Sequence, residues 1–166
     1  GGTATQDVTI TLTGEADSVP PDGTNWYIDN SAVGSANTGS PTDPFTSIAA
    51  FNAAQGTPGG PGAGDNVFLL AGTGTYAEAD GINLLNGQIL TGVAAGPLRP
   101  TIVTTAGDGI NVAQNNTVAG IDIGSTSGAG ITDSGGNVGT LNVTDVGKSG
   151  DGQIADIDQG GTLNVT

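Results

Sequence analysis

The sequence predicts an all-β fold: a right-handed parallel β-helix, or solenoid, with a short N-terminal capping helix and a separate N-terminal strand. Short apolar runs alternate with turns rich in Gly, Asp and Asn, and related motifs recur at intervals of roughly 20–28 residues. A unit of that length cannot bury its apolar side chains alone, whereas units stacked in register can. Runs this short are also unlike the longer hairpin strands of a β-sandwich.

The first recurring motif combines an Asp-Gly turn with a short strand. Asp80–Leu84 recurs as Asp108–Val112 after 28 residues, and in part at 129–131 and 151–154. Short apolar runs bounded by turns are typical of strands buried in a parallel sheet. We therefore expect stacked parallel coils in which three residues superpose: Ile82, Ile110 and Ile131.

The second recurring motif follows the first in each unit. Thr140–Thr144 recurs unchanged as Thr162–Thr166 after 22 residues, and Gly120–Ile123 resembles both. The alternation predicts that Leu141 and Leu163 point inward and stack on each other. It also predicts an outward column of polar side chains, made by Asp122, Asn142 and Asn164.

The first 23 residues are predicted to hold a separate strand and a linker. Residues 7–13 alternate threonines with three apolar residues, Val8, Ile10 and Leu12, as a half-buried strand does. Pro20 and Pro21 then fix an extended linker that ends in a turn. The strand could cap this solenoid, end an upstream domain, or pair with a neighbouring molecule, and the three apolar residues are our candidates for assembly.

Residues 24–65 are predicted to cap the solenoid, and 66–166 to form its coils. We expect a helix over about 43–55, because Thr42 or Asp43 can act as N-cap, Pro44 suits the first turn and Gly56 can end it. The sequence stops inside a strand motif, so we expect the solenoid to continue past Thr166.

The charge balance restricts the partners. Sixteen acidic residues oppose only Arg99 and Lys148, a net charge of −14. Such a surface repels phosphates, and no stretch has the ~20 apolar residues of a membrane span, so we expect neither nucleic-acid binding nor direct membrane insertion. The acidic surface suits a salty, calcium-rich exterior. Histidine and cysteine are absent, which removes a histidine base and thiolate chemistry.

The chain resembles the secreted right-handed parallel β-helix proteins of bacteria. Residues 26–29, 43–48 and 64–69 resemble the capped start of pectate-lyase-like folds, and the Thr-Leu-Asn-Val-Thr repeats resemble those of adhesins and autotransporter passengers. The resemblance implies a secreted or cell-surface location. It also implies, as partners, a host, cell-surface or matrix glycan or protein, or neighbouring subunits. It specifies fold better than function, because this scaffold hosts lyases, hydrolases, tailspikes and adhesins.

Catalytic signatures of the resembling enzymes are largely missing. The hydrolases use aspartates with a Gly-His-Gly segment, and this chain has no histidine. The lyases need an Arg or Lys base beside aspartate-bound calcium, and Arg99 and Lys148 lie in separate turns. Asp156 and Asp158 form the one close carboxylate pair in the repeats, so two-carboxylate glycosidase chemistry is a weak candidate there. Solvated turn residues are the simpler interpretation.

Two further sites are candidates for ligands. Asp80 and Asp108 could hold Ca²⁺ between coils, although six to eight oxygen ligands must converge on that ion. The Asp-Gly pairs are explained more simply as tight turns with glycine at positive φ, so we expect no cofactor apart from a possible Ca²⁺. Trp26 and Tyr27 could stack on carbohydrate, whereas their place beside Ile28 favours a buried cap.

The sequence thus predicts an extracellular structural or adhesive module, a stalk or passenger segment without catalysis. One alternative is a carbohydrate-active β-helix, a polysaccharide lyase or hydrolase, whose catalytic coils lie outside this segment. A second is a self-assembling filament or surface-layer subunit that uses addition of the N-terminal strand.

Overall fold

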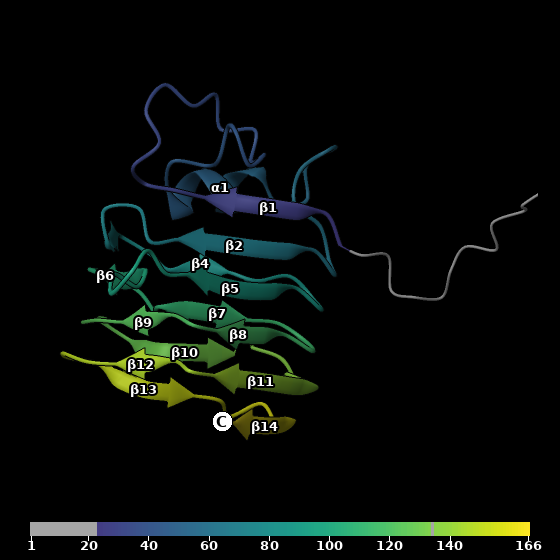
Figure 1. Ribbon diagram of the computed structural model, residues 1–166. Coiled ribbons are helices and arrows are strands. Elements are labelled where there is room, and N and C mark those ends of the chain that lie inside the picture. Colours follow the sequence, from purple (N-terminus) through teal and green to yellow (C-terminus); the bar gives the residue numbers. More distant parts are fainter. Residues whose placement is uncertain (1–22, 134) are drawn as a thin grey trace, which may run out of the picture.

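The protein is a parallel β-solenoid, as predicted, in the computed structural model, which describes residues 23–133 and 135–166. Figure 1 shows the strands stacked in layers, with the helix at one end and the last strand at the other. Every pairing between named strands is parallel. The predicted strand at 7–13, with Val8, Ile10 and Leu12, lies outside the described residues.

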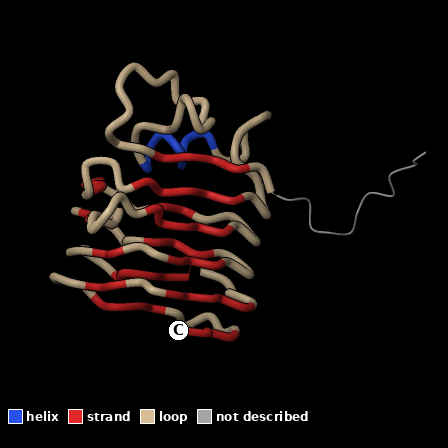
Figure 2. The backbone as a smooth tube through the Cα atoms, in the orientation of Figure 1, coloured by secondary structure: helices blue, strands red, loops and turns tan. Residues whose placement is uncertain are grey.

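Three sheets form the walls. The first is β1 (Asn25–Ile28), β2 (Asn66–Leu70), β5 (Ile89–Val93), β8 (Thr117–Ala119), β11 (Thr140–Thr144) and β14 (Thr162–Val165), in that order. The second is β3 (Thr75–Glu78), β6 (Thr101–Thr104), β9 (Asp122–Ile123) and β12 (Gly147–Lys148). The third is β4 (Ile82–Asn83), β7 (Ile110–Val112), β10 (Ala129–Asp133) and β13 (Gln153–Asp156). Each full coil gives one strand to each wall (Figure 2).

The strand register confirms the predicted stacking. Ile110 pairs with both Ile82 and Ile131, and Leu141 pairs with Leu163. Between the walls runs one continuous core of aliphatic side chains, closed at the N-terminal end by aromatic ones. The predicted polar column is wrong in one member: Asn164 donates to Asn142 at 2.9 Å in the first sheet, but Asp122 lies on β9 in the second. The spacing between motifs varies between coils, so similarity of sequence alone misassigned that strand.

The helix α1 (Ile48–Ala54) is shorter than the predicted 43–55. Its N-cap is Ser47, whose Oγ accepts from the backbone N–H of Ala50 at 3.0 Å. Asp43 cannot act as N-cap, because its carboxylate accepts from Ser35 Oγ and from the Ala36 N–H, each at 2.6 Å. The residues between form an extended segment that pairs with β1.

The N-terminal end of the solenoid is closed by this segment. Phe45, Ile48 and Phe51 are buried, and the rings of Phe45 and Phe51 meet edge to face with centroids 5.8 Å apart. The helix also pairs with backbone groups at the edge of the third sheet. The Asn52 side chain donates to Gly81 O at 2.9 Å and accepts from the Asn83 N–H at 3.0 Å. The core and the sheet edge are therefore both covered at this end.

Candidate assembly surface

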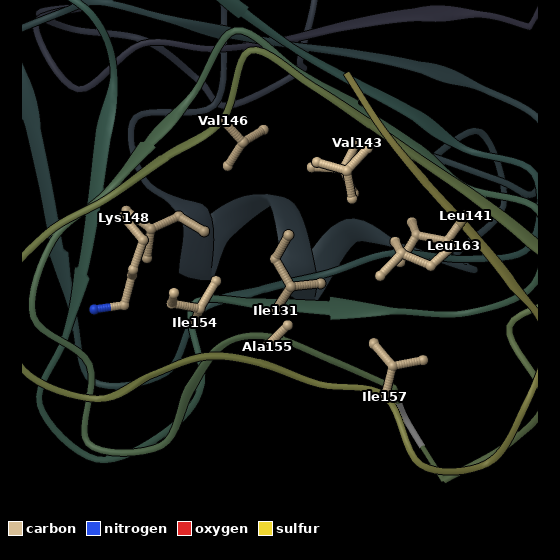
Figure 3. A pocket seen from close by; sticks show the side chains of 11 residues that line it. Ile131, Leu141, Val143, Val146, Lys148, Ile154, Ala155, Ile157 and Leu163 are labelled. Carbon is tan, nitrogen blue, oxygen red and sulfur yellow. The ribbon is translucent and has the colours of Figure 1, made fainter.

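At its other end, the described part of the solenoid finishes with a coil that no further described strand covers. β12, β13 and β14 each end the order of their sheet, and the side chains of β13 and β14 are exposed. Ile154, Leu163 and Val165 are 74%, 46% and 67% exposed, respectively. With the other side chains of the last coil they surround an apolar cavity of about 160 Å³, viewed from close by in Figure 3. We call β12, β13, β14 and this cavity the open end face.

A matched pair of strands shows that position, not sequence, makes this face apolar and exposed. β11 and β14 contain the same Thr-Leu-Asn-Val sequence and pair in register. Leu141 and Val143 in β11 are 0% and 7% exposed, against 46% and 67% for Leu163 and Val165 in β14. Another strand stacked on β14 would therefore bury Leu163 and Val165, just as β14 buries Leu141 and Val143 of β11.

The backbone of β14 is also unpaired on one side. Thr162 and Thr166 donate toward β11, to Gly139 O at 2.7 Å and Val143 O at 3.0 Å. Backbone groups alternate sides along a strand, so Leu163 and Val165 direct theirs away from β11. No described strand pairs with that edge. An edge of this kind beside exposed apolar side chains is a template for another strand, which can be the next coil of a longer chain or a strand of another molecule.

Lys148 lies at the rim of the cavity and serves the fold. Its Nζ donates to the carbonyl oxygens of Gly124, Ser149 and Asp151, at 2.9, 3.0 and 2.7 Å. Its methylene chain lines the cavity (Figure 3). The ammonium group thus ties one coil to the next.

Arg99 has a similar role at another corner. Its Nη1 lies 2.9 Å from a carboxylate oxygen of Asp145, and its Nε lies 3.4 Å from one of Asp122. Its Nη2 also donates to the Asp145 carbonyl oxygen. One guanidinium therefore ties together three successive coils, and both basic side chains of the chain are engaged in such ties.

Asp156 and Asp158 lie on the exposed margin of the open end face. Both side chains are exposed, at and just beyond the end of β13. The carboxylate of Asp133 accepts from the backbone N–H groups of Asp158 and Gln159, each at 2.9 Å. The structure thus places the pair at an exposed turn held by a third carboxylate.

Asp80 and Asp108 share a register, but Asp108 is engaged elsewhere. Ile82 pairs with Ile110, which aligns the two aspartates two residues earlier. Asp108 Oδ1 accepts from the Ala129 N–H in the next coil, at 2.6 Å. Among the residues that the structure describes, no three acidic side chains converge as a metal site would need.

The glycines of these Asp-Gly pairs correct our turn interpretation. Gly152 has a φ of 96°, whereas Gly81 and Gly109 do not have positive φ. A Cβ on Gly81 would lie 1.9 Å from Gly109 O in the next coil, and one on Gly109 would lie 2.7 Å from Gly130 O. Close stacking of backbones, rather than a left-handed turn, requires glycine at both positions.

Trp26 and Tyr27 point to opposite sides of β1. The Trp26 indole donates to Asp65 at 2.7 Å, and its ring packs on Phe45 with centroids 6.1 Å apart, so it belongs to the end cap. Tyr27 faces outward and stacks on Phe68, with centroids 5.2 Å apart and planes at 21°. One face of the Tyr27 ring is therefore covered, which leaves less of it for a sugar.

Sequence analysis did not identify the open end face as a site. The available signal was the unchanged repeat of Thr140–Thr144, which marks two strands of equal chemistry in adjacent coils. No helix within the described residues has the length and apolar character of a membrane span. Comparison with protein-family models, curated proteins and solved structures finds no match to this chain.

Proposed function

We propose that this chain is a non-catalytic structural and adhesive module of an extracellular bacterial surface protein, a solenoid that spans or binds. The observation that carries the proposal is the use of its two basic side chains. Arg99 and Lys148 are both engaged in bonds between coils, and a lyase base must instead be free to take a proton from substrate. The rest of the charged surface is acidic, which keeps a rod soluble in salt.

The fold supports a load-bearing role. Side-chain amides bond from coil to coil on the outer surface, as in Asn111 to Asn83 at 2.8 Å and Asn164 to Asn142 at 2.9 Å. Together with the two basic ties, these bonds run along the axis of the rod. A solenoid so built suits a spacer that presents its surface away from a cell.

The test is a parallel assay of cleavage and binding. The purified chain is incubated with polygalacturonate, alginate and a neutral β-glucan, with and without Ca²⁺, and is passed over the same glycans and matrix collagen immobilised. We expect no new chain ends and retention on at least one surface at physiological salt. Turnover that disappears in Asp156→Asn or Asp158→Asn, and persists in the matched variant Asp151→Asn, would show an enzyme.

A further inference from the structure

We propose that Asn115 is an acceptor for N-linked glycosylation, in which a sugar is attached to the side-chain amide nitrogen. Three segments of the chain read Asn-X-Thr without proline at X, which is the acceptor pattern of this modification: 115–117, 142–144 and 164–166. Of the three asparagines, Asn115 alone combines an exposed position with an amide nitrogen that has no described partner. The proposal goes beyond a spacer or adhesive role, since it concerns a group that the module would carry.

Asn115 lies in the turn between β7 and β8, at a corner of the solenoid. Its φ of 58° is in the left-handed region, which asparagine adopts more readily than most residues other than glycine. The backbone holds this turn in place, since the Asn115 N–H donates to Val138 O in the next coil at 2.8 Å. Asn115 itself is exposed. A fixed position that faces solvent can carry a bulky polar group without displacing the core.

The two polar atoms of the Asn115 amide have separate roles. Its Oδ1 accepts from the Thr140 N–H in the next coil at 3.0 Å. Because that N–H can only donate, the amide oxygen faces it, and the nitrogen takes the other position of the amide. Among the described residues, none accepts a hydrogen bond from Nδ2. A sugar on the nitrogen leaves the carbonyl oxygen intact, so the bond to Thr140 persists after modification.

The transfer needs a glycosyl donor and an enzyme that are separate from this chain. The donor is an oligosaccharide whose first sugar carries a lipid-linked pyrophosphate at C1. Nδ2 forms a bond to C1 as the bond from C1 to the phosphate oxygen breaks, and the electron pair of that bond leaves with the pyrophosphate. One proton leaves Nδ2 to a base of the enzyme, the amide keeps one N–H, and nothing is oxidised or reduced.

Asn142 has the same motif in a different environment. It lies within β11, between a strand of the preceding coil and a strand of the next, and is half-buried. Its Nδ2 lies 3.5 Å from Thr117 Oγ1, and its Oδ1 accepts from Asn164 Nδ2 at 2.9 Å. Neighbouring strands lie only about 4.8 Å apart, so a sugar on this nitrogen would have to enter the row of side chains between two strands. The fold therefore disfavours Asn142 as an acceptor.

The experiment offers the purified, folded chain to an oligosaccharyltransferase that recognises Asn-X-Thr, together with its lipid-linked donor, and maps glycopeptides by mass spectrometry. Peptides of the three segments are the control, since all three should be modified once the fold is removed. In the folded chain we expect modification at Asn115 and its loss at Asn142. Asn115→Asp keeps the oxygen that accepts from Thr140 and removes only the nitrogen, so it should abolish modification at this position.

Two variants at the third position of the motif separate recognition from folding. Thr117→Val removes the hydroxyl that the motif requires and should lose the modification at Asn115, whereas Thr117→Ser keeps the hydroxyl and should retain it. Valine favours a strand at least as well as threonine does, so a loss in the valine variant alone cannot come from disruption of β8.

Two outcomes would overturn the proposal. In the first, folded Asn142 is modified to the same extent as Asn115, which would show that the fold does not select between the segments. In the second, Asn115 stays unmodified in the folded chain, whether or not its peptide is modified. Neither outcome depends on binding or cleavage of glycans by the chain, so the proposal can fail while the proposed function stands, and the reverse.

Discussion

Asn116 donates from its side chain to the backbone carbonyl oxygen of Gln88 in the preceding coil, at 3.0 Å, and both residues are fully buried. The two are consecutive members of a polar column at one corner of the solenoid, which begins with Asp65. In all three, a side-chain oxygen accepts from the N–H three residues earlier, at 2.7–2.8 Å. The column thus closes each turn and bonds it to the next coil.

Removing the amide of Asn116 should therefore destabilise the protein. Asn116→Ala leaves the Ala113 N–H without its partner. It also removes one of two hydrogen bonds from Leu85 O and from Gln88 O, which still accept from the N–H groups of Gln88 and Thr117. A buried unsatisfied group costs about 1–3 kcal/mol, so we expect a loss of that size, about 1–3 kcal/mol, in the free energy of unfolding. Urea denaturation measures it. The matched control is Asn111→Ala on the outer surface, with an expected loss below about 1 kcal/mol. Equal losses in the two variants would show that the buried column contributes no more to stability than an amide on the outer surface.

Gly81→Ala should be among the most damaging single methyl additions. The new Cβ would overlap Gly109 O in the next coil, so the coils must separate locally, and overpacking of this kind costs about 1–3 kcal/mol or more. Thermal unfolding should show a clear fall in the melting temperature. Gly136→Ala is the control, because nothing lies within 4 Å of its added Cβ. A Gly81→Ala variant as stable as this control would mean that the coils stack less closely than described.

Repetition is the reason that the fold could be predicted from the sequence. Each coil repeats an inward isoleucine or leucine, and Ile82, Ile110 and Ile131 superpose as that repeat requires. The start of the helix could not be predicted, because several residues in 42–47 are acceptable caps. Asp43 is excluded as N-cap because its carboxylate accepts hydrogen bonds from Ser35 and Ala36. These two residues lie in a loop whose sequence has no periodicity, so the contact could not be foreseen.

The candidate site was harder to predict than the fold. Sequence patterns identify chemical groups, such as Asp156 and Asp158, but not the exposure of an apolar residue in a stack. Leu163 has the same neighbours in sequence as Leu141, and only the position of its coil in the solenoid exposes it. Asp108 illustrates the same limit, since its partner Ala129 belongs to the next coil.

Acid should weaken the capping loop through Asp43. Hydrogen bonds from Ser35 and Thr38 hold the pKa of the Asp43 carboxyl below its ordinary value near 3.8. A lowered folded-state pKa contributes stability above the unfolded value, and that contribution is lost as the pH falls through the folded pKa. The free energy of unfolding of wild type should thus fall more steeply below about pH 4 than that of Asp43→Asn. Parallel slopes of stability against pH would contradict this assignment.

Calcium should have little specific effect on stability. Asp108 is occupied by the Ala129 N–H, so we expect Ca²⁺ to change the melting temperature no more than Mg²⁺ at the same ionic strength. Differential scanning calorimetry over a Ca²⁺ titration provides the measurement. A saturable rise that disappears in Asp108→Asn would instead reveal a specific site, since a bound ligand stabilises in proportion to RT ln(1 + [L]/Kd).

Amide hydrogen exchange at β11 and β14 tests the described stacking of the coils most directly. In dilute solution, the amides of Leu163 and Val165 should exchange far faster than those of Leu141 and Val143, their equivalents in an identical sequence. Protection of Leu163 and Val165 equal to that of Leu141 and Val143 in dilute solution would contradict the open end.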